Sequence, residues 1–140
     1  MTVQAARIQI PDHHRRAVVP HVMVDDAAAA IDFYKGAFGA VELFRLEGAA
    51  GRIVHAEVTV HGSTLMLGDV DAPFSTPDRV GASVALHVYV PDVDGLTTTA
   101  VNLGAELLAA PADMPYGARQ SKLRDPFGHV WIFLTPIVTA

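Results

Sequence analysis

Apolar and polar positions divide this chain into two halves with the same order of elements. The stretch VVPHVMV at residues 18–24 alternates and is rich in valine, which predicts a strand. Asp25 and Asp26 offer an N-cap for a helix over residues 27–38, where apolar side chains recur at helical spacing, and Gly39 suits the helix C-terminus. Three further strands are predicted over residues 41–47, 52–60 and 63–68.

The second half repeats this order. The segment HVMVDD that begins at His21 corresponds to HVYVPD, which begins at His87. After Asp92 the pattern predicts a helix over residues 93–103. The strands of this half are predicted over residues 84–90, 105–109, 118–124 and 129–135. Two loops that contain proline and glycine connect these elements, at residues 69–83 and 110–117.

Each half therefore reads as a βαβββ module, and the predicted fold class is α+β with two tandem modules at residues 18–68 and 84–136. One helix covers only one face of a four-stranded sheet. We expect the two curved mixed sheets to form a cavity with their uncovered faces, either within one chain or between two chains. Residues 1–17 are expected to be an N-terminal arm of this single domain.

Composition excludes several classes of protein. The 140 residues are 51% hydrophobic, yet no apolar run reaches the roughly 18 residues that span a membrane. No secretory leader is visible, so we expect a cytoplasmic protein. The chain has no cysteine, which excludes disulfides and thiolate metal sites. With a net charge of -5 and scattered basic residues, no nucleic-acid surface is predicted, and we interpret His13, His14, Arg15 and Arg16 as a solvated or partner-contacting tail.

Three motifs carry a resemblance to a known family. They are Asp25 with IDFYKGAFGA at residues 31–40, VPDVDGL at residues 90–96 and DPFGHVW at residues 125–131. These motifs resemble the vicinal oxygen chelate (VOC) superfamily of glyoxalases, bleomycin resistance proteins and dioxygenases, most of all its glyoxalase-like bacterial members. The resemblance covers residues 18–136 and implies a single VOC domain. Relatives include metal lyases, dioxygenases and antibiotic-sequestering proteins, so the resemblance implies the fold more specifically than the activity.

The resemblance also implies where a metal site belongs. Metal-binding relatives carry histidine, glutamine or glutamate on the first and last strand of each module. Carried over to this sequence, the four positions fall on apolar residues, namely Val19, Met66, Ala85 and Ile132. None of these offers the imidazole or carboxylate that a divalent ion requires. We therefore expect no metal at the family positions.

Alternation along the strands predicts which side chains face the cavity. Aliphatic positions such as Val22, Val24, Val54, Ala56 and Val58 should pack on the helices. The mixed rows should line the cavity and bind a ligand, together with Tyr116 from the loop at residues 112–120, which is a candidate cavity lip with Met114 and Arg119. The predicted ligand-binding residues are His21, Met23, His55, Glu57, Met66, His87, Tyr89, Tyr116 and Ile132.

The roles of the polar members of this set stay open. His21 and His87 occupy equivalent places in the two modules and could be hydrogen-bonded interior histidines, ligand contacts or part of a displaced metal site with Glu57 or His55. Glu57 is a candidate general base, or a carboxylate that orients a histidine. Trp131 is interpreted as a core residue beneath a helix, and Phe74 is a weaker candidate for the cavity edge.

Two classes of function remain. The first is a small-molecule binding protein that sequesters an aromatic or amphipathic metabolite or antibiotic without a metal, for which methionine and tyrosine on the cavity face are suitable. The alternative is a metal-dependent glyoxalase-like lyase, isomerase or dioxygenase, with zinc, nickel, manganese or iron on His21, His87 and Glu57. A metal-free acid–base enzyme that uses Glu57 and a histidine is a third possibility. We prefer the binding protein, and we expect a homodimer.

Overall fold

The structure is a computed structural model that describes residues 17–71, 74–77 and 84–137. The first module consists of β1 (His21–Val24), α1 (Ala27–Phe38), β2 (Val41–Glu47), the short 3-10 helix η2 (Ala49–Gly51), β3 (Ile53–Val60) and β4 (Ser63–Asp69). The second consists of β5 (Ala85–Tyr89), α2 (Val93–Asn102), β6 (Glu106–Asp113), β7 (Ala118–Arg124) and β8 (Val130–Pro136). The predicted α+β fold with two βαβββ modules is confirmed.

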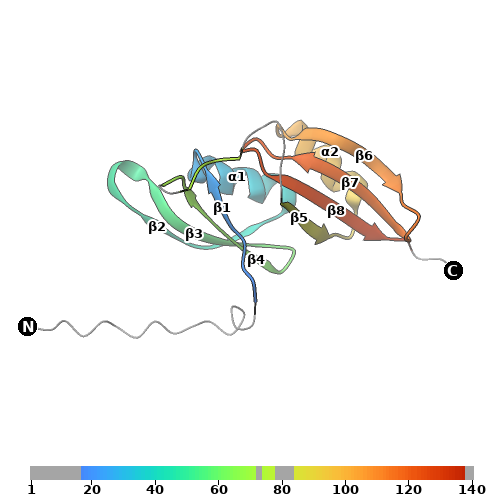
Figure 1. The fold of residues 1–140 in the computed structure, drawn as a ribbon, viewed down its shortest axis with the longest axis horizontal. Coiled ribbons are helices and arrows are strands. Elements are labelled where there is room, and N and C mark those ends of the chain that lie inside the picture. Colours follow the sequence, from blue (N-terminus) through green and yellow to red (C-terminus); the bar gives the residue numbers. More distant parts are fainter. Residues whose placement is uncertain (1–16, 72–73, 78–83, 138–140) are drawn as a thin grey trace, which may run out of the picture.

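Each module forms a separate four-stranded sheet with the same topology. Sheet A has the strand order β1-β4-β3-β2, and sheet B has the order β5-β8-β7-β6. Figure 1 shows the two sheets side by side, with α1 in the middle of the molecule. The register repeats as well, because His21 pairs with Met66 on the parallel β1 and β4, and His87 pairs with Ile132 on the parallel β5 and β8. The two modules are therefore equivalent residue by residue at their centres.

Local capping explains where the helices begin and end. The Asp26 carboxylate accepts a hydrogen bond from the backbone N–H of Ala29, and Asp92 does the same for Gly95 at the start of α2. Gly39 ends α1 with a φ of 68°, a left-handed conformation that glycine adopts without a steric penalty. The predicted limits of α1 are therefore confirmed, and α2 ends one residue earlier than predicted.

Helix α1 packs against both modules through its aromatic side chains. The Phe38 ring lies 4.7 Å from the ring of Trp131 and 4.9 Å from that of Phe133, measured between ring centroids. Both of these partners belong to β8 of the second module and are buried, as is Tyr34 on the same helix. Trp131 is a core residue, as the sequence indicated, and the helix that covers it comes from the other module.

A single buried carboxylate completes this contact between the modules. Asp125, at the end of β7, is 3% exposed and accepts hydrogen bonds from the Tyr34 hydroxyl (2.8 Å) and the Trp131 indole N–H (2.9 Å). It also accepts the backbone N–H groups of Phe127 (2.9 Å) and His129 (3.0 Å) in the β7–β8 turn. Burial, and next the charge of Asp125, raise the pKa of Tyr34 well above 10, so that its hydroxyl stays a donor.

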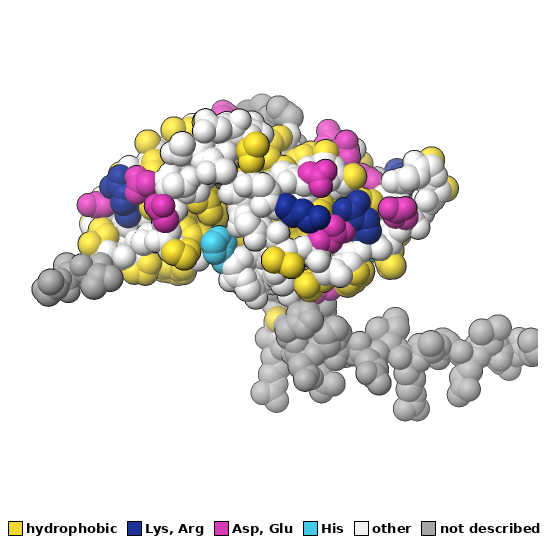
Figure 2. All heavy atoms as spheres, turned by 180° about the vertical axis from the view of Figure 1, so that it is seen from behind, with side chains coloured by type: hydrophobic (Ala, Val, Ile, Leu, Met, Phe, Trp, Pro, Cys, Tyr) yellow, Lys and Arg dark blue, Asp and Glu magenta, His cyan; other side chains and the backbone are white. Residues whose placement is uncertain are grey.

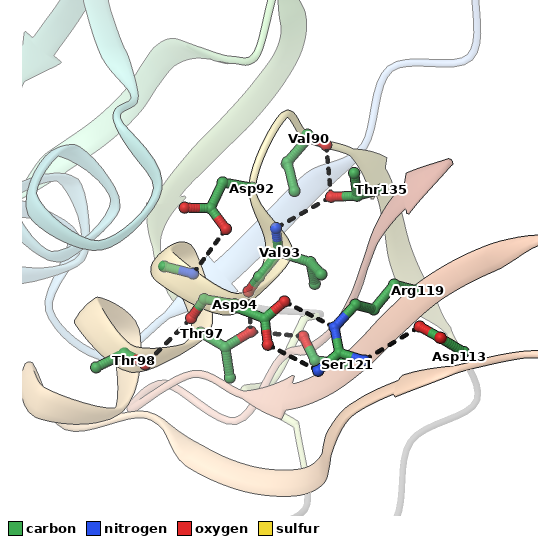
Figure 3. A network of polar contacts seen from close by, with 11 residues as sticks. Val90, Asp92, Val93, Asp94, Thr97, Thr98, Asp113, Arg119, Ser121 and Thr135 are labelled. Carbon is green, nitrogen blue, oxygen red and sulfur yellow. Dashed lines mark hydrogen bonds and ion pairs between the residues drawn. The ribbon is translucent and has the colours of Figure 1, made fainter. Parts of the chain in front are cut away.

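Helix α2, in contrast, is held on sheet B by polar contacts (Figure 3). The Thr97 hydroxyl donates to the Val93 carbonyl and lies 2.8 Å from the Ser121 hydroxyl on β7, where both side chains are buried. Arg119 on β7 forms ion pairs with Asp94 on α2 and with Asp113 on β6. These contacts direct Ser121 and Arg119 toward the helix, so the residues that alternate with them on β7 face away from it.

Two sequence-based expectations are wrong in detail. Strand β6 continues to Asp113, inside the predicted loop, because β6 is an edge strand and Pro111 lies where its register with β7 shifts. Val54 was expected beneath α1 but is 54% exposed, because a register shift lets Ile53 take the buried position. Of the two arrangements expected for the cavity, the sheets of one chain do not form the first, because they lie side by side without closing on each other (Figure 1).

The surface carries no continuous basic stripe on the face that Figure 2 shows, where positive and negative side chains lie next to one another. Among the described residues, no helix is long and apolar enough to cross a membrane. The basic residues at positions 13–16 lie outside the described part of the chain.

We predict that Asp125→Ala lowers the free energy of unfolding by about 3 kcal/mol, because it leaves buried donors from both modules without an acceptor. Tyr34→Phe, which removes one donor, should cost about 1 kcal/mol. Urea denaturation measures both, with the exposed Asp32→Asn on α1 as the control. A midpoint for Asp125→Ala equal to that of the control would show that the carboxylate does not stabilise the contact.

Candidate functional site

The face of sheet A that points away from α1, here called open face A, carries the polar residues that alternation placed there. Its central row runs across three strands, because His21 pairs with Met66 and Met66 pairs with Glu57. Met23 and His55 lie two residues along on β1 and β3 and share this face. The structure thus brings five of the nine predicted ligand-binding residues onto one surface.

Two histidines of open face A meet across the strand that separates them. His21 is on β1 and His55 is on β3, on either side of β4, and their ring centroids lie 5.3 Å apart in an edge-to-face arrangement. Partial burial, and next the positive charge of His55, lower the pKa of His21 below 6.5. A neutral His21 imidazole can both donate and accept a hydrogen bond.

A ring and a carboxylate extend this pair. The Phe44 ring on β2 lies 5.7 Å from that of His55, so three rings follow one another across the sheet. Glu57 is only 3% exposed although it lies on the face that no helix covers. Open face A therefore combines flat rings, two methionines and one buried carboxylate, which can contact an aromatic or amphipathic molecule. Phe44 was missed by the sequence analysis, although its pairing with Glu57 places it at this site.

The corresponding surface of sheet B, here called open face B, carries His87, Tyr89 and Ile132. The rings of His87 and Tyr89 lie 5.5 Å apart and are exposed. Tyr116 donates its hydroxyl to the side-chain carbonyl of Gln120, and Gln120 and Tyr89 both pair with Leu134. Tyr116, the tyrosine of the predicted cavity lip, is thus hydrogen-bonded to a residue of open face B.

The structure also places two other candidates, Arg119 from the predicted lip and Phe74 from the predicted cavity edge. Arg119 is held toward α2 by its ion pairs with Asp94 and Asp113. Phe74 is 60% exposed in the loop between the modules.

A groove of about 680 Å³ lies between the two modules. It is lined by residues 17–20, by residues 60–65 around the β3–β4 turn, by the edge strand β5 and by Trp131. This inter-module groove contains Val19 and Ala85 together with His87 and Tyr89. The sequence did not predict it, because it depends on how the edge of one sheet lies against the other.

The structure does not bring the two predicted key histidines together. The ring contacts of His21 and His87 are to His55 and to Tyr89, each within its own sheet. Within residues 17–71, 74–77 and 84–137, no group of three or more histidine, aspartate or glutamate side chains is arranged to hold a metal ion.

Comparison with known proteins identifies the family. The chain matches the Glyoxalase/Bleomycin resistance protein/Dioxygenase superfamily over residues 13–133. The chain belongs to this superfamily. An uncharacterized protein of Mycobacterium bovis is 43% identical over 128 residues, which cover 86% of this chain and 84% of that protein. An uncharacterized protein of Arabidopsis thaliana is 32% identical over 114 residues, which cover 74% of this chain and 68% of that protein.

Solved structures of the superfamily share this fold. TioX from Micromonospora sp. ML1 aligns with a TM-score of 0.69 at 29% identity, over 85% of this chain and 97% of that one. A glyoxalase/bleomycin resistance protein/dioxygenase family enzyme from Burkholderia phytofirmans aligns with a TM-score of 0.71 at 22% identity, over 85% and 97%. At 22% identity, the likeness to the Burkholderia protein shows a shared fold and nothing more. The resemblance seen in the sequence motifs is therefore confirmed at the level of the superfamily.

The superfamily implies a divalent metal ion, which the residues at the expected positions do not fit. Val19 and Ala85 line the inter-module groove, whereas Met66 and Ile132 are half-buried on the open faces. Their side chains offer no imidazole or carboxylate to a hard or borderline ion. We derive no chemical step through a metal at these four positions.

The lowered pKa of His21 predicts a pH-dependent stability. The His21 imidazole binds a proton less tightly in the folded chain than in the unfolded chain. The stability that the neutral imidazole contributes is therefore complete above pH 6.5 and is lost as the pH falls toward the lower pKa of the folded state. His21→Gln should therefore lose less stability than wild type between about pH 7.5 and 5.5. NMR titration should also show the His21 pKa rising in His55→Gln but not in the turn variant His61→Gln. Equal losses in wild type and His21→Gln would contradict this account.

Proposed function

We propose that this chain is a small-molecule binding protein that holds an aromatic or amphipathic metabolite or antibiotic without a metal. The observation that carries the proposal is the run of rings on open face A, in which Phe44, His55 and His21 follow one another at 5.7 and 5.3 Å. Flat side chains with few rotatable bonds bind planar ligands at a low cost in conformational entropy. The apolar residues at the family metal positions support binding rather than metal-assisted chemistry.

The polar groups on the two open faces also support the recognition of a small-molecule ligand. Glu57 is a buried carboxylate of open face A, and the neutral imidazole of His21, in the same row on the other side of Met66, can donate or accept a hydrogen bond. A few placed polar groups on an apolar surface orient a ligand, while the apolar area supplies most of the affinity. On open face B, His87 and Tyr89 provide a second pair of rings.

A homodimer would complete the site. Both open faces are uncovered by helices in one chain, and the two sheets do not enclose a volume between them. We propose that open face A of one chain faces open face B of a second copy, so that each dimer contains two equivalent cavities.

If this dimer forms, light scattering at micromolar concentration should give twice the mass of one chain. The equivalent positions of His21 and His87 in the two modules support the same pseudo-symmetric closure for both cavities. A monomeric mass under these conditions would contradict the proposed closure of the site.

We predict that His87→Ala weakens ligand binding at least tenfold, which corresponds to about 1.4 kcal/mol, and leaves the fold intact because the side chain is exposed. The ligand is first sought by thermal-shift screening of planar aromatic metabolites and antibiotics, with thiol adducts of 2-oxoaldehydes as the contrasting set. Asp32→Asn is the control, since it changes an exposed side chain on α1, away from both open faces.

Two results of this experiment would refute parts of the proposal. Turnover of the adducts after addition of nickel or zinc would favour the alternative, a metal-dependent lyase or isomerase that uses His21, His87 and Glu57. A lower melting temperature of His87→Ala without an effect on affinity would show that this histidine is structural.

A further inference from the structure

The repeated register pairs one acidic and one basic residue at equivalent positions of the two sheets. On sheet A the central row reads His21, Met66 and Glu57, from β1 through β4 to β3. On sheet B the same row reads His87, Ile132 and Lys122, from β5 through β8 to β7. Lys122 therefore occupies on open face B the place that Glu57 occupies on open face A.

The neighbours of Lys122 on β7 determine which way its side chain points. Ser121 and Leu123 are buried, and Ser121 contacts Thr97 on α2. Because successive residues of a strand face opposite sides of the sheet, Lys122 faces away from α2, beside Ile132. Its side chain is exposed, and none of the ion pairs between described residues involves it.

A second cation strengthens the positive charge of this face. Arg124 lies two residues further along β7 and so shares the face of Lys122. Its Nε atom is buried and makes no hydrogen bond within the described residues, although it lies 3.4 Å from a carboxylate oxygen of the exposed Glu106. One carboxylate thus accompanies two cations at this end of open face B, whereas the matching row of open face A carries Glu57.

We propose that Lys122 binds an acidic group of the ligand, a carboxylate, sulfonate or phosphate, while the rings of His87 and Tyr89 contact its aromatic part. This inference rests on the proposed small-molecule binding function and specifies its ligand class as an acidic aromatic compound. The equivalent position of open face A carries Glu57 in place of a cation, so the ammonium group that an acidic ligand would contact at this position lies on open face B. An ammonium group on a flexible stem can reach an anion at several positions above the sheet.

Two fluorescent dyes with the same aromatic skeleton test this assignment. One is 1-anilinonaphthalene-8-sulfonate, and the other is N-phenyl-1-naphthylamine, which lacks the sulfonate. Wild-type protein should bind the sulfonate about tenfold more tightly than the uncharged dye, since a charge-assisted contact adds to shared apolar burial. Lys122→Gln should reduce this ratio to near one by weakening sulfonate binding alone, and Lys122→Arg should retain it.

The chain offers a matched control, because Lys35 is its only other lysine. Lys35 lies on α1 and is paired with Glu42, so Lys35→Gln should leave the ratio unchanged. Acetylation of the lysines, followed by mass spectrometry, gives an independent readout. Bound sulfonate dye should protect Lys122 and leave Lys35 as reactive as before.

The outcomes separate this inference from the function on which it rests. If both dyes bind but Lys122→Gln changes neither affinity, or lowers both equally, Lys122 does not recognise an anion while the binding function stands. If neither dye binds, the proposed function fails and the assignment of Lys122 fails with it. Melting temperatures of the variants establish that each one is folded.

Discussion

The buried carboxylate of Asp125 is the interaction on which the arrangement of the two modules depends. It collects four hydrogen bonds, from Tyr34 of the first module and from Trp131 and two backbone amides of the second. Removing a carboxylate from water is costly unless such donors replace the solvent. The packed rings of Tyr34, Phe38 and Trp131 exclude water from it, and its hydrogen bonds fix the orientation of the Tyr34 and Trp131 rings. Helix α1 therefore lies on both modules, and within the described residues no helix covers the opposite face of either sheet (Figure 1).

The chemistry of the molecule follows from those two uncovered faces. Pseudo-symmetry places similar groups at equivalent positions, such as His21 and His87. Glu57 and Lys122 differ, because an acidic residue of β3 is matched by a basic residue of β7. In the proposed dimer, a cavity with one acidic and one basic wall selects the orientation of its ligand as well as its shape. The helix-facing row of β3 is apolar, whereas that of β7 carries Ser121 and Arg119, which contact α2.

The sequence predicted those parts of the structure that depend on local rules. The sequence repeat and the caps at Asp26 and Asp92 were sufficient to predict the two modules. The alternation along β3 was sufficient to predict that His55 and Glu57 share one face of the sheet. Contacts that depend on strand order were not predictable in this way. His21 meets His55 rather than His87 because β4 inserts between β1 and β3, which only the topology reveals.

Two other findings show different reasons for a missed prediction. The contact of Tyr34 with Asp125 joins residues 91 positions apart and leaves no periodic signal in the sequence. Lys122, by contrast, could have been found, because alternation along β7 places it opposite Ser121 and next to Ile132.

We propose that this protein binds an aromatic or amphipathic ligand without a metal. Isothermal titration calorimetry of chelator-treated protein, with a ligand from the thermal-shift screen, measures this binding. We expect saturable binding with one site per chain and an affinity that added zinc or nickel does not change. Binding that occurs only after the metal is added would contradict it.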